Sequence, residues 1–280
     1  YRESLSFPDV GFRVVRAPVS STSITNASPS AATHWETPSL AFLGSFTNLA
    51  TALRMVPVPS GVVSGVVETY DEEGGLNWEE VSLSTRSAFY IGTCEVTQAL
   101  YEGIMGTNPC ETIQTDLPVD FVSWFDAVDF CARLTAAGHS VSNGIPQNWA
   151  FRLPTETEWE VACRTNQNFG VVIGASDETA WFSENSYGIL HPVGMKSPNE
   201  FGVFDMLGNV GEWCSDWHRD SYPRFAGIDE GGPFYGTMKV CRGGSASASA
   251  DICTSARRFA VSPESRFAQL GFRIVLAPID

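Results

Sequence analysis

The sequence predicts a single large α+β domain in which helices come early and short strands follow. Thr97, Ser123 and Thr155 each occupy a position suited to capping the start of an amphipathic helix. After Arg164 the chain becomes rich in glycine and aromatic residues, a composition that favours short strands and turns. Helices and strands that are separated along the chain, rather than alternating, are typical of the α+β class.

The composition is that of a globular, loop-rich and acidic protein. Of its 280 residues 43% are hydrophobic, while 25 are glycine and 16 are proline. The net charge of -15 would repel polyphosphates and anionic membrane surfaces, so nucleic acid is not an expected partner. No apolar run is long enough to cross a bilayer, and no basic region followed by an apolar stretch opens the given sequence.

Seven cysteines are spread singly along the chain, without a Cys-x-x-Cys pair that would indicate a zinc ribbon or a thioredoxin-like site. This number suits an exported protein with one or two disulfides, located at the cell surface or in the periplasm. A cytosolic protein with buried, unreactive thiols is the alternative.

The first part of the chain, residues 1–50, is expected to form an extended N-terminal segment rich in Ser, Thr, Ala and Pro. Within it the stretch 9–18 resembles the stretch 269–278, since both contain Gly-Phe-Arg and end in Ala-Pro. The two copies could be strands that lie side by side, or the first could end a preceding related module. Both alternatives stay open.

The expected globular domain spans residues 51–280. Its first strand contains two prolines, which confine it to the edge of a sheet. Glycines stop the first two helices, and a Thr-x-x-Glu capping box opens the third. The expected elements are, in order, strands at Met55–Pro59, after Gly61 and at Phe89–Ile91, and helices from Thr97 to Gly106, from Ser123 to Gly138 and after Thr155.

The last forty or so residues contain fixed points that we call the C-terminal frame: Arg242–Ser245, Cys253–Arg257, Pro263, Arg266 and Gly271–Arg273. The residues between these points follow neither a strand nor a helix period. A rigid scaffold that displays unpatterned side chains is what recognition requires, although a loop without function is the alternative. The candidate recognition positions are Ala246, Ser247, Ala248, Ser249, Asp251, Ile252, Phe259, Val261, Ser262, Ser265, Phe267 and Ala268.

Several motifs occur in one order: Glu95-Val96-Thr97, Arg152–Glu156, Asp205–Val210 followed by Glu212-Trp213, Arg242–Ser245 and Gly271–Arg273. In these motifs the chain resembles the formylglycine-generating-enzyme (sulfatase-modifying-factor) family. The resemblance runs from about Met55 to Pro278. It implies a C-type-lectin-like fold of the formylglycine-generating-enzyme type, with short mixed strands and a few helices.

Enzymatic activity is a separate question. The family's enzymes oxidise a cysteine in a sulfatase peptide with copper held by two cysteines that follow the Gly-Gly-Ser turn, and thiolates suit Cu(I). Here the stretch from Ala246 to Ile252 contains no cysteine, so we expect no copper, no catalytic residues and no oxidase. The resemblance implies that Cys253 could instead pair with Cys163. An oxidase with a rearranged site, or a catalytically inactive structural relative, is the alternative.

The substitutions concentrated in the C-terminal frame resemble those in variable proteins of diversity-generating retroelements, including that of Treponema. Such systems randomise adenines, and the Ala, Ser, Asp, Ile, Phe and Val found here are reachable from Asn codons. Drift in an inactive relative is the alternative. The resemblance implies a ligand-binding surface protein with a macromolecular, protein partner, in which Phe259, Val261 and Phe267 should be exposed together with residues 246–249.

A cation site is implied by the same family resemblance. Calcium would be held by the carboxylates of Asp205 and Glu212 and by the backbone carbonyls of Gly208 and Val210, since hard oxygen ligands suit this ion. The alternative is a tight glycine turn in which Asn209 hydrogen-bonds the backbone.

Overall fold

The structure is a computed structural model that describes residues 53–60, 62–70, 76–140, 144–165, 173–219 and 234–279. For residues 62–70 and 76–83 it describes the backbone alone. The expected N-terminal segment 1–50, with its copy of the Gly-Phe-Arg stretch, therefore lies outside the described residues.

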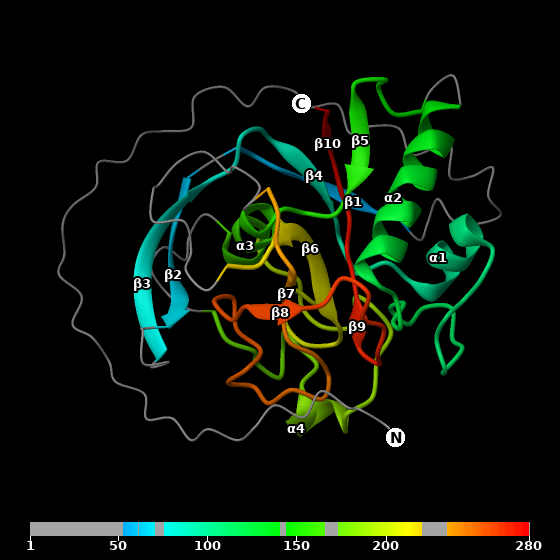
Figure 1. The fold of residues 1–280 in the computed structure, drawn as a ribbon. Helices are drawn as coiled ribbons and strands as arrows, with labels where there is room; N and C mark the ends of the chain where they lie inside the picture. The colour runs from blue at the N-terminus through cyan, green and yellow to red at the C-terminus, as the bar shows by residue number, and fades with distance from the viewer. Residues whose placement is uncertain are drawn as a thin grey trace.

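A four-stranded antiparallel sheet forms one side of the domain (Figure 1), with the order β1-β4-β10-β5. Strand β1 is the outer strand, as its prolines predicted. The last strand of the chain, β10, lies between β4 and β5. The strands of this sheet are β1 (Met55–Val58), β4 (Phe89–Gly92), β5 (Trp149–Arg152) and β10 (Val275–Pro278).

A second four-stranded sheet has the order β8-β7-β6-β9, in which β6 and β9 run parallel and the other pairs run antiparallel. A separate two-stranded ribbon pairs Val62 with Ser84 at one end and Tyr70 with Leu76 at the other. These strands are β6 (Gly211–Trp217), β7 (Lys239–Arg242), β8 (Phe259–Val261) and β9 (Leu270–Gly271), with β2 (Val62–Tyr70) and β3 (Leu76–Ser84) in the ribbon.

The three predicted helix starts are confirmed. The side chain of Thr97 accepts a hydrogen bond from Leu100 N, and Ser123 and Thr155 each form a complete capping box. The second helix continues through Gly138, where the sequence predicted its end. The helices are α1 (Gln98–Met105), α2 (Trp124–His139), α3 (Glu156–Arg164) and a short α4 (Ser183–Ser186) that the sequence did not predict.

The two sheets are joined by the stretch from Leu270 to Pro278, which belongs first to β9 and then to β10. A Cβ atom on Gly271 would lie 2.3 Å from the carbonyl oxygen of Val119, so only glycine permits this close backbone approach. Phe272 is buried against Tyr101 and Phe130. The Gly-Phe-Arg motif is therefore part of the core.

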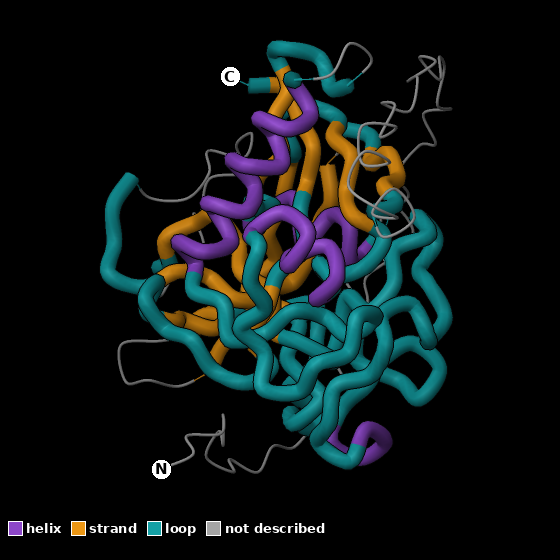
Figure 2. Tube along the Cα trace, turned by 90° about the vertical axis from the view of Figure 1, so that its right-hand side faces the viewer, coloured by secondary structure: helices purple, strands orange, loops and turns teal. Residues whose placement is uncertain are grey.

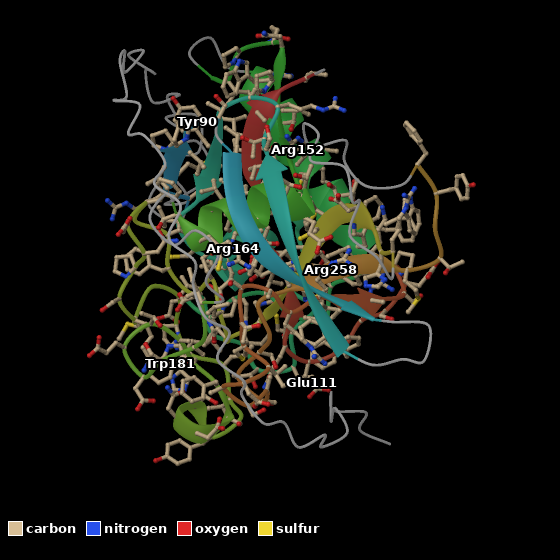
Figure 3. All side chains as sticks on the ribbon, turned by 90° about the vertical axis from the view of Figure 1, so that its left-hand side faces the viewer. Tyr90, Glu111, Arg152, Arg164, Trp181 and Arg258 are labelled. Carbon is tan, nitrogen blue, oxygen red and sulfur yellow. The ribbon has the colours of Figure 1, made fainter. Side chains whose placement is uncertain are left out.

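Loops make up most of one half of the molecule, whereas helices and strands fill the other half (Figure 2). Helix α4 lies in the loop-rich half (Figures 1 and 2). Helix α3 contacts β3. In the side view, Tyr90 and Arg152 lie toward one end of the molecule and Trp181 lies toward the other, loop-rich end (Figure 3). The second sheet thus borders the loops that include the C-terminal frame.

Candidate ligand-binding site

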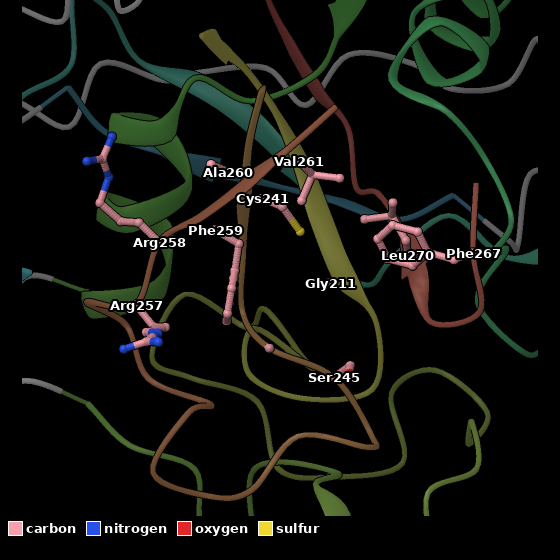
Figure 4. Close-up of a pocket in the computed structure, with 11 residues that line it drawn as sticks. Gly211, Cys241, Ser245, Arg257, Arg258, Phe259, Ala260, Val261, Phe267 and Leu270 are labelled. Carbon is pink, nitrogen blue, oxygen red and sulfur yellow. The ribbon is translucent and has the colours of Figure 1, made fainter. Parts of the chain in front are cut away.

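A cavity of about 210 Å³ lies against the second sheet (Figure 4). Its walls come from all four strands of that sheet and from the C-terminal frame. The residues that line it are Gly211, Cys241, Gly244, Ser245, Arg257, Arg258, Phe259, Ala260, Val261, Phe267 and Leu270.

The apolar wall of the cavity comes from the edge strand β8 and from the chain that leads into β9. Phe259 and Val261 lie two residues apart on β8, a spacing that places both side chains on one face of a strand. Phe267 and Leu270 lie across from them (Figure 4). Phe259, Val261 and Phe267 are half-buried, so each combines contact with the core and access from the cavity.

The floor of the cavity holds a thiol. A Cβ atom on Gly211 would lie 3.0 Å from Sγ of Cys241, so glycine in β6 leaves room for this side chain. Burial raises the pKa of Cys241. A thiol with a raised pKa behaves as a small hydrophobic group rather than as a nucleophile or metal ligand.

Arg257 and Arg258 lie at the other end of the cavity (Figure 4). Arg258 forms a bidentate ion pair with Glu156, with Nε 2.6 Å from Oε1 and one terminal nitrogen 2.8 Å from Oε2. Arg257 is half-buried, and its guanidinium carbon lies 5.7 Å from the ring centre of Phe259. A charged side chain therefore lies next to the apolar wall of the cavity.

A buried charge network lies behind this end of the cavity. Glu156 also pairs with Arg242 of β7, and a terminal nitrogen of Arg242 lies 2.9 Å from an oxygen of Glu160. Burial alone would raise the pKa of Glu156, but Arg258 and Arg242 outweigh this effect and lower its pKa to about 2. The network links α3 to β7 and to the residue before β8, which fixes the backbone that forms the cavity.

The expected recognition positions do not form one exposed surface. Phe259, Val261 and Phe267 line the cavity, but Ala246 and Ala248 are buried, with 0% and 5% of their surface exposed. The expectation that residues 246–249 share an exposed face with the three apolar residues is therefore corrected. Of the other positions, Ser247, Asp251 and Ala268 are exposed, and Ser249, Ile252, Ser262 and Ser265 are partly buried.

The burial of Ala246 and Ala248 comes from contacts with a segment that is distant in sequence. The loop around α4 binds the backbone of both residues: Ser186 Oγ donates to the carbonyl of Ala246 at 2.6 Å, and the backbone N–H of Ser183 donates to the carbonyl of Ala248 at 2.8 Å. The backbone N–H of Ser247 donates to the side chain of Gln269 at 2.8 Å. These contacts hold residues 246–248 in place, and Ala248 packs in an apolar cluster of buried residues.

All seven cysteines are free thiols, so the disulfide between Cys163 and Cys253 is not formed. Both residues are buried in the same apolar cluster. Burial raises the pKa of Cys253 to about 12, and its sulfur lies 3.6 Å from the carbonyl oxygen of Ser245. The number of cysteines therefore gives no support for export through disulfide formation.

The contacts of Glu212 do not fit a calcium ligand. Both carboxylate oxygens of Glu212 bind Arg273, at 2.6 and 2.7 Å, and one of them also accepts from Trp159 Nε1 at 2.8 Å. One oxygen of Asp205 accepts a hydrogen bond from Gly194 N at 2.6 Å, and its other oxygen is buried without a hydrogen-bond partner among the described residues. The side chain of Asn209 accepts a hydrogen bond from the backbone N–H of His191 and donates one to its carbonyl oxygen, as the glycine-turn alternative predicted. The described residues contain no group of three or more His, Cys, Asp or Glu side chains arranged to hold a metal.

The other two expected ligands, Gly208 and Val210, have structural roles. A Cβ atom on Gly208 would lie 1.9 Å from the carbonyl oxygen of Trp181, and Val210 is fully buried. Arg273, which pairs with Glu212, also donates to the carbonyl oxygens of Gly92 and Phe204.

Sequence reasoning missed the polar residues of the cavity, above all Cys241, Arg257 and Arg258. A signal for the two arginines was available, because adjacent arginines directly before Phe259 are unusual in a chain with net charge -15. No sequence signal identifies Cys241 as a cavity residue, since it lies on a different strand. Within the described part of the chain, no helix is long and apolar enough to cross a membrane.

Comparison with known proteins identifies relatives of two kinds. A family model described as "Sulfatase-modifying factor enzyme 1-like domain" matches residues 45–278. The curated relatives include the chaperone protein LppX of Paenibacillus barcinonensis, 32% identical over 180 residues, which cover 48% of this chain and 64% of the relative. They also include the formylglycine-generating enzyme of Thermomonospora curvata, 31% identical over 208 residues, which cover 66% of this chain and 63% of that enzyme. The chain thus spans less than two thirds of the length of these two relatives.

Among solved structures, Treponema denticola variable protein 1 is similar with a TM-score of 0.66 and 30% identity, over 81% of this chain and 95% of that one. PvdO from Pseudomonas aeruginosa has a TM-score of 0.61 at 21% identity, over 79% of this chain and 93% of that one, which shows a shared fold alone. The predicted C-type-lectin-like α+β fold and the two predicted resemblances are confirmed.

Proposed function

The chain belongs to the sulfatase-modifying factor enzyme 1-like family, and we propose that within this family it is a ligand-binding protein rather than an oxidase. In this proposal the ligand is a protein, recognised at the cavity on the second sheet. The residues between the fixed points of the C-terminal frame would be the positions that a retroelement diversifies.

One observation carries the proposal. Phe259, Val261 and Phe267, three positions that break the family pattern in sequence, converge on a single cavity. Concave sites with mostly apolar walls and a few polar groups are typical of ligand binding. The charge network of Glu156 and Arg242 holds their backbone in place, so changes at these positions alter the cavity rather than the scaffold.

The cysteines argue against oxidase chemistry. Copper in the family's enzymes needs two thiolates close together, and Cys241 is the one cysteine among the described cavity residues. The sulfur of Cys253 lies in the core beside the carbonyl oxygen of Ser245. Burial raises the pKa of both thiols, which disfavours the thiolate that would bind Cu(I).

The oxidase remains the second candidate, because a relative of similar sequence is a formylglycine-generating enzyme. The two candidates differ in a direct assay. A sulfatase-motif peptide incubated with this protein, Cu(I) and oxygen should show no aldehyde product by mass spectrometry. Turnover at an enzymatic rate would contradict the proposal.

Binding at the cavity can be tested with peptides selected from a displayed random library. Val261→Trp places a large side chain in the cavity and should abolish binding of the selected peptides. Ala268→Trp is the matched control, because Ala268 is exposed and is not among the cavity residues. Peptides that bind both variants as well as the unchanged protein would show that the cavity is not the binding site.

An exported location, at the cell surface or in the periplasm, is part of the proposal. It rests on the kind of recognition that the resemblance to variable proteins implies, and no longer on cysteine content. Fractionation of cells that express the natural gene would test it.

A further inference from the structure

The cavity reaches β8, the outer strand of the second sheet, and this position restricts the form of the ligand. Resting on the proposed binding function, we infer that the ligand is an extended polypeptide segment that pairs with β8 as a further strand of this sheet. An uncharged apolar side chain of that segment enters the cavity.

The hydrogen bonds of the sheet determine which backbone groups of β8 face outward. Successive residues of a strand direct their backbone groups alternately to the two sides. The backbone N–H of Gly211 donates to the carbonyl of Gln269, on the β9 side. Glu212 therefore faces β7, where it lies opposite Arg242. Cys241, the neighbour of Arg242, then faces β8.

The register of β7 and β8 places Ala260 at the free edge of the sheet. Phe259 lies opposite Cys241 and Val261 lies opposite Lys239, so both turn their backbone groups toward β7. The N–H and carbonyl of Ala260, between them, point away from the sheet. Ala260 is exposed, and outside the ladder with β7 none of the described residues hydrogen-bonds its backbone. Backbone groups at a sheet edge bind an added strand.

A strand paired with Ala260 presents alternate side chains to the cavity. Residues directly opposite each other on paired strands carry their side chains on the same face of the sheet. The ligand residue opposite Ala260 therefore points away from the cavity. Its two neighbours lie opposite Phe259 and Val261, whose side chains line the cavity (Figure 4). The ligand is thus expected to have apolar residues two positions apart.

The cavity fits one uncharged side chain of moderate size. An apolar cavity of about 150 Å³ holds a benzene molecule, so about 210 Å³ has room for one leucine or phenylalanine side chain. Arg258 is paired with Glu156, and Arg257 interacts with other groups of the chain. Burial raises the pKa of the Cys241 thiol, which keeps it neutral. A charged ligand group would lose its water there without gaining an opposite charge.

Backbone N-methylation of a bound peptide tests the strand pairing directly. Linear peptides are selected from a displayed random library on the full chain, and each residue of a selected peptide is then N-methylated in turn. The N–H groups of a paired strand face β8 and solvent alternately. We expect binding to weaken about tenfold where the methyl group removes the N–H that faces Ala260. N-methylation of the two neighbouring residues should have little effect.

Ala260→Pro removes the outward N–H of β8 and leaves the bonds to β7 in place, since proline is tolerated where a strand N–H faces solvent. It should weaken binding of the selected peptides about tenfold, while thermal unfolding shows a folded protein. Ala268→Pro is the matched control, because Ala268 is exposed and is not among the cavity residues. It also precedes Gln269, whose φ is 64°, a turn position that accepts proline.

Hydrogen exchange in the unchanged protein provides a measurement that needs no variant. The Ala260 amide should exchange more slowly when a selected peptide is bound, because its N–H then donates to the peptide backbone. NMR resolves the exchange of this amide from that of its neighbours. Together with the N-methylated peptides, it decides the question even where Ala260→Pro does not fold.

The outcomes separate the inference from the function on which it rests. Binding that Val261→Trp abolishes, but that responds to N-methylation without alternation or is equal for Ala260→Pro and Ala268→Pro, would overturn the inference and leave the cavity as a binding site. Peptides that bind Val261→Trp as well as the unchanged protein, or a library that yields no binder, would overturn both. An alternating response, with binding lost in Ala260→Pro and retained in Ala268→Pro, would support both.

Discussion

Replacement of Arg273 by methionine should destabilise the fold strongly, because this side chain is the central positive charge of the core. It is fully buried and pairs with both carboxylate oxygens of Glu212. It also donates to the carbonyl oxygens of Gly92, Phe204 and Asp205. Methionine keeps most of the stem volume but makes none of these contacts.

The expected magnitude follows from the charge that is left behind. Loss of one partner from a buried ion pair costs about 3–5 kcal/mol, because the other partner remains charged in the interior. In a domain of this size each kcal/mol lowers the melting temperature by about 2–4 °C. Arg273→Met should therefore lower the melting temperature by about 6–20 °C.

Thermal unfolding followed by circular dichroism provides the assay. Arg266→Met is the matched control, because its ion pair with Asp126 is exposed and should contribute no more than about 1 kcal/mol. Glu212→Gln combined with Arg273→Met should be more stable than Arg273→Met alone, since the stranded charge is gone. Similar melting temperatures for Arg273→Met and Arg266→Met would refute the reasoning.

Three further predictions concern the charge network, the Gly-Gly turn and the cation. Glu156→Gln should lower the free energy of unfolding at pH 7, and this loss should fade as the pH falls from about 4.5 to 2, because a carboxyl whose pKa is lowered in the fold stabilises the fold above that range. Glu102→Gln, which changes an exposed carboxylate on α1, should have no such effect in urea melts. Gly244→Ala should lower the free energy of unfolding more than Gly106→Ala in the same assay. Both glycines have a positive φ, but a Cβ atom at Gly244 would lie 2.6 Å from the sulfur of Cys253, whereas a Cβ atom at Gly106 would have no atom within 4 Å. Addition of calcium or of EGTA should leave the melting temperature unchanged, and a clear increase with calcium would contradict the fit of the carboxylates to Arg273.

The elements that the sequence predicted best are those with local causes. Thr97, Ser123 and Thr155 cap their helices through contacts within three residues, so the pattern is visible in the sequence itself. The order of motifs likewise predicted the fold. Helix α4 spans only four residues, and its N-cap residue is Phe182, whose side chain cannot accept a hydrogen bond, so the usual capping pattern is absent.

The candidate site was predicted only in part, because its geometry depends on contacts between distant segments. Phe259 and Phe267 were identified, yet the cavity also needs Cys241 from another strand. Ala246 was expected at the surface because an irregular insert has no period to indicate burial. Its burial depends on a hydrogen bond from Ser186, which lies 60 residues away in sequence.

The ion pair that occupies Glu212, one of the expected calcium ligands, was not predicted for a related reason. A family resemblance predicts which residues could bind a metal ion together. It does not predict which other side chains form hydrogen bonds or ion pairs with them. Glu212 does lie at the centre of the core, as a ligand would. There its two oxygens are bound by Arg273, whose position 61 residues later is not evident from the spacing of the loop.

The structure also implies that the inserts differ in how far they can vary. Ala246 and Ala248 lie in the core beneath the α4 loop, so a larger side chain there must displace packed atoms, at a typical cost of about 1–3 kcal/mol. Val261 and Phe267 face a cavity, where a change of side chain alters the space offered to a ligand before it strains the scaffold. Selection for new ligands would therefore act on the second group, while the first group is held to small residues. If the region is diversified, its useful variation lies around the cavity and not evenly along the C-terminal frame.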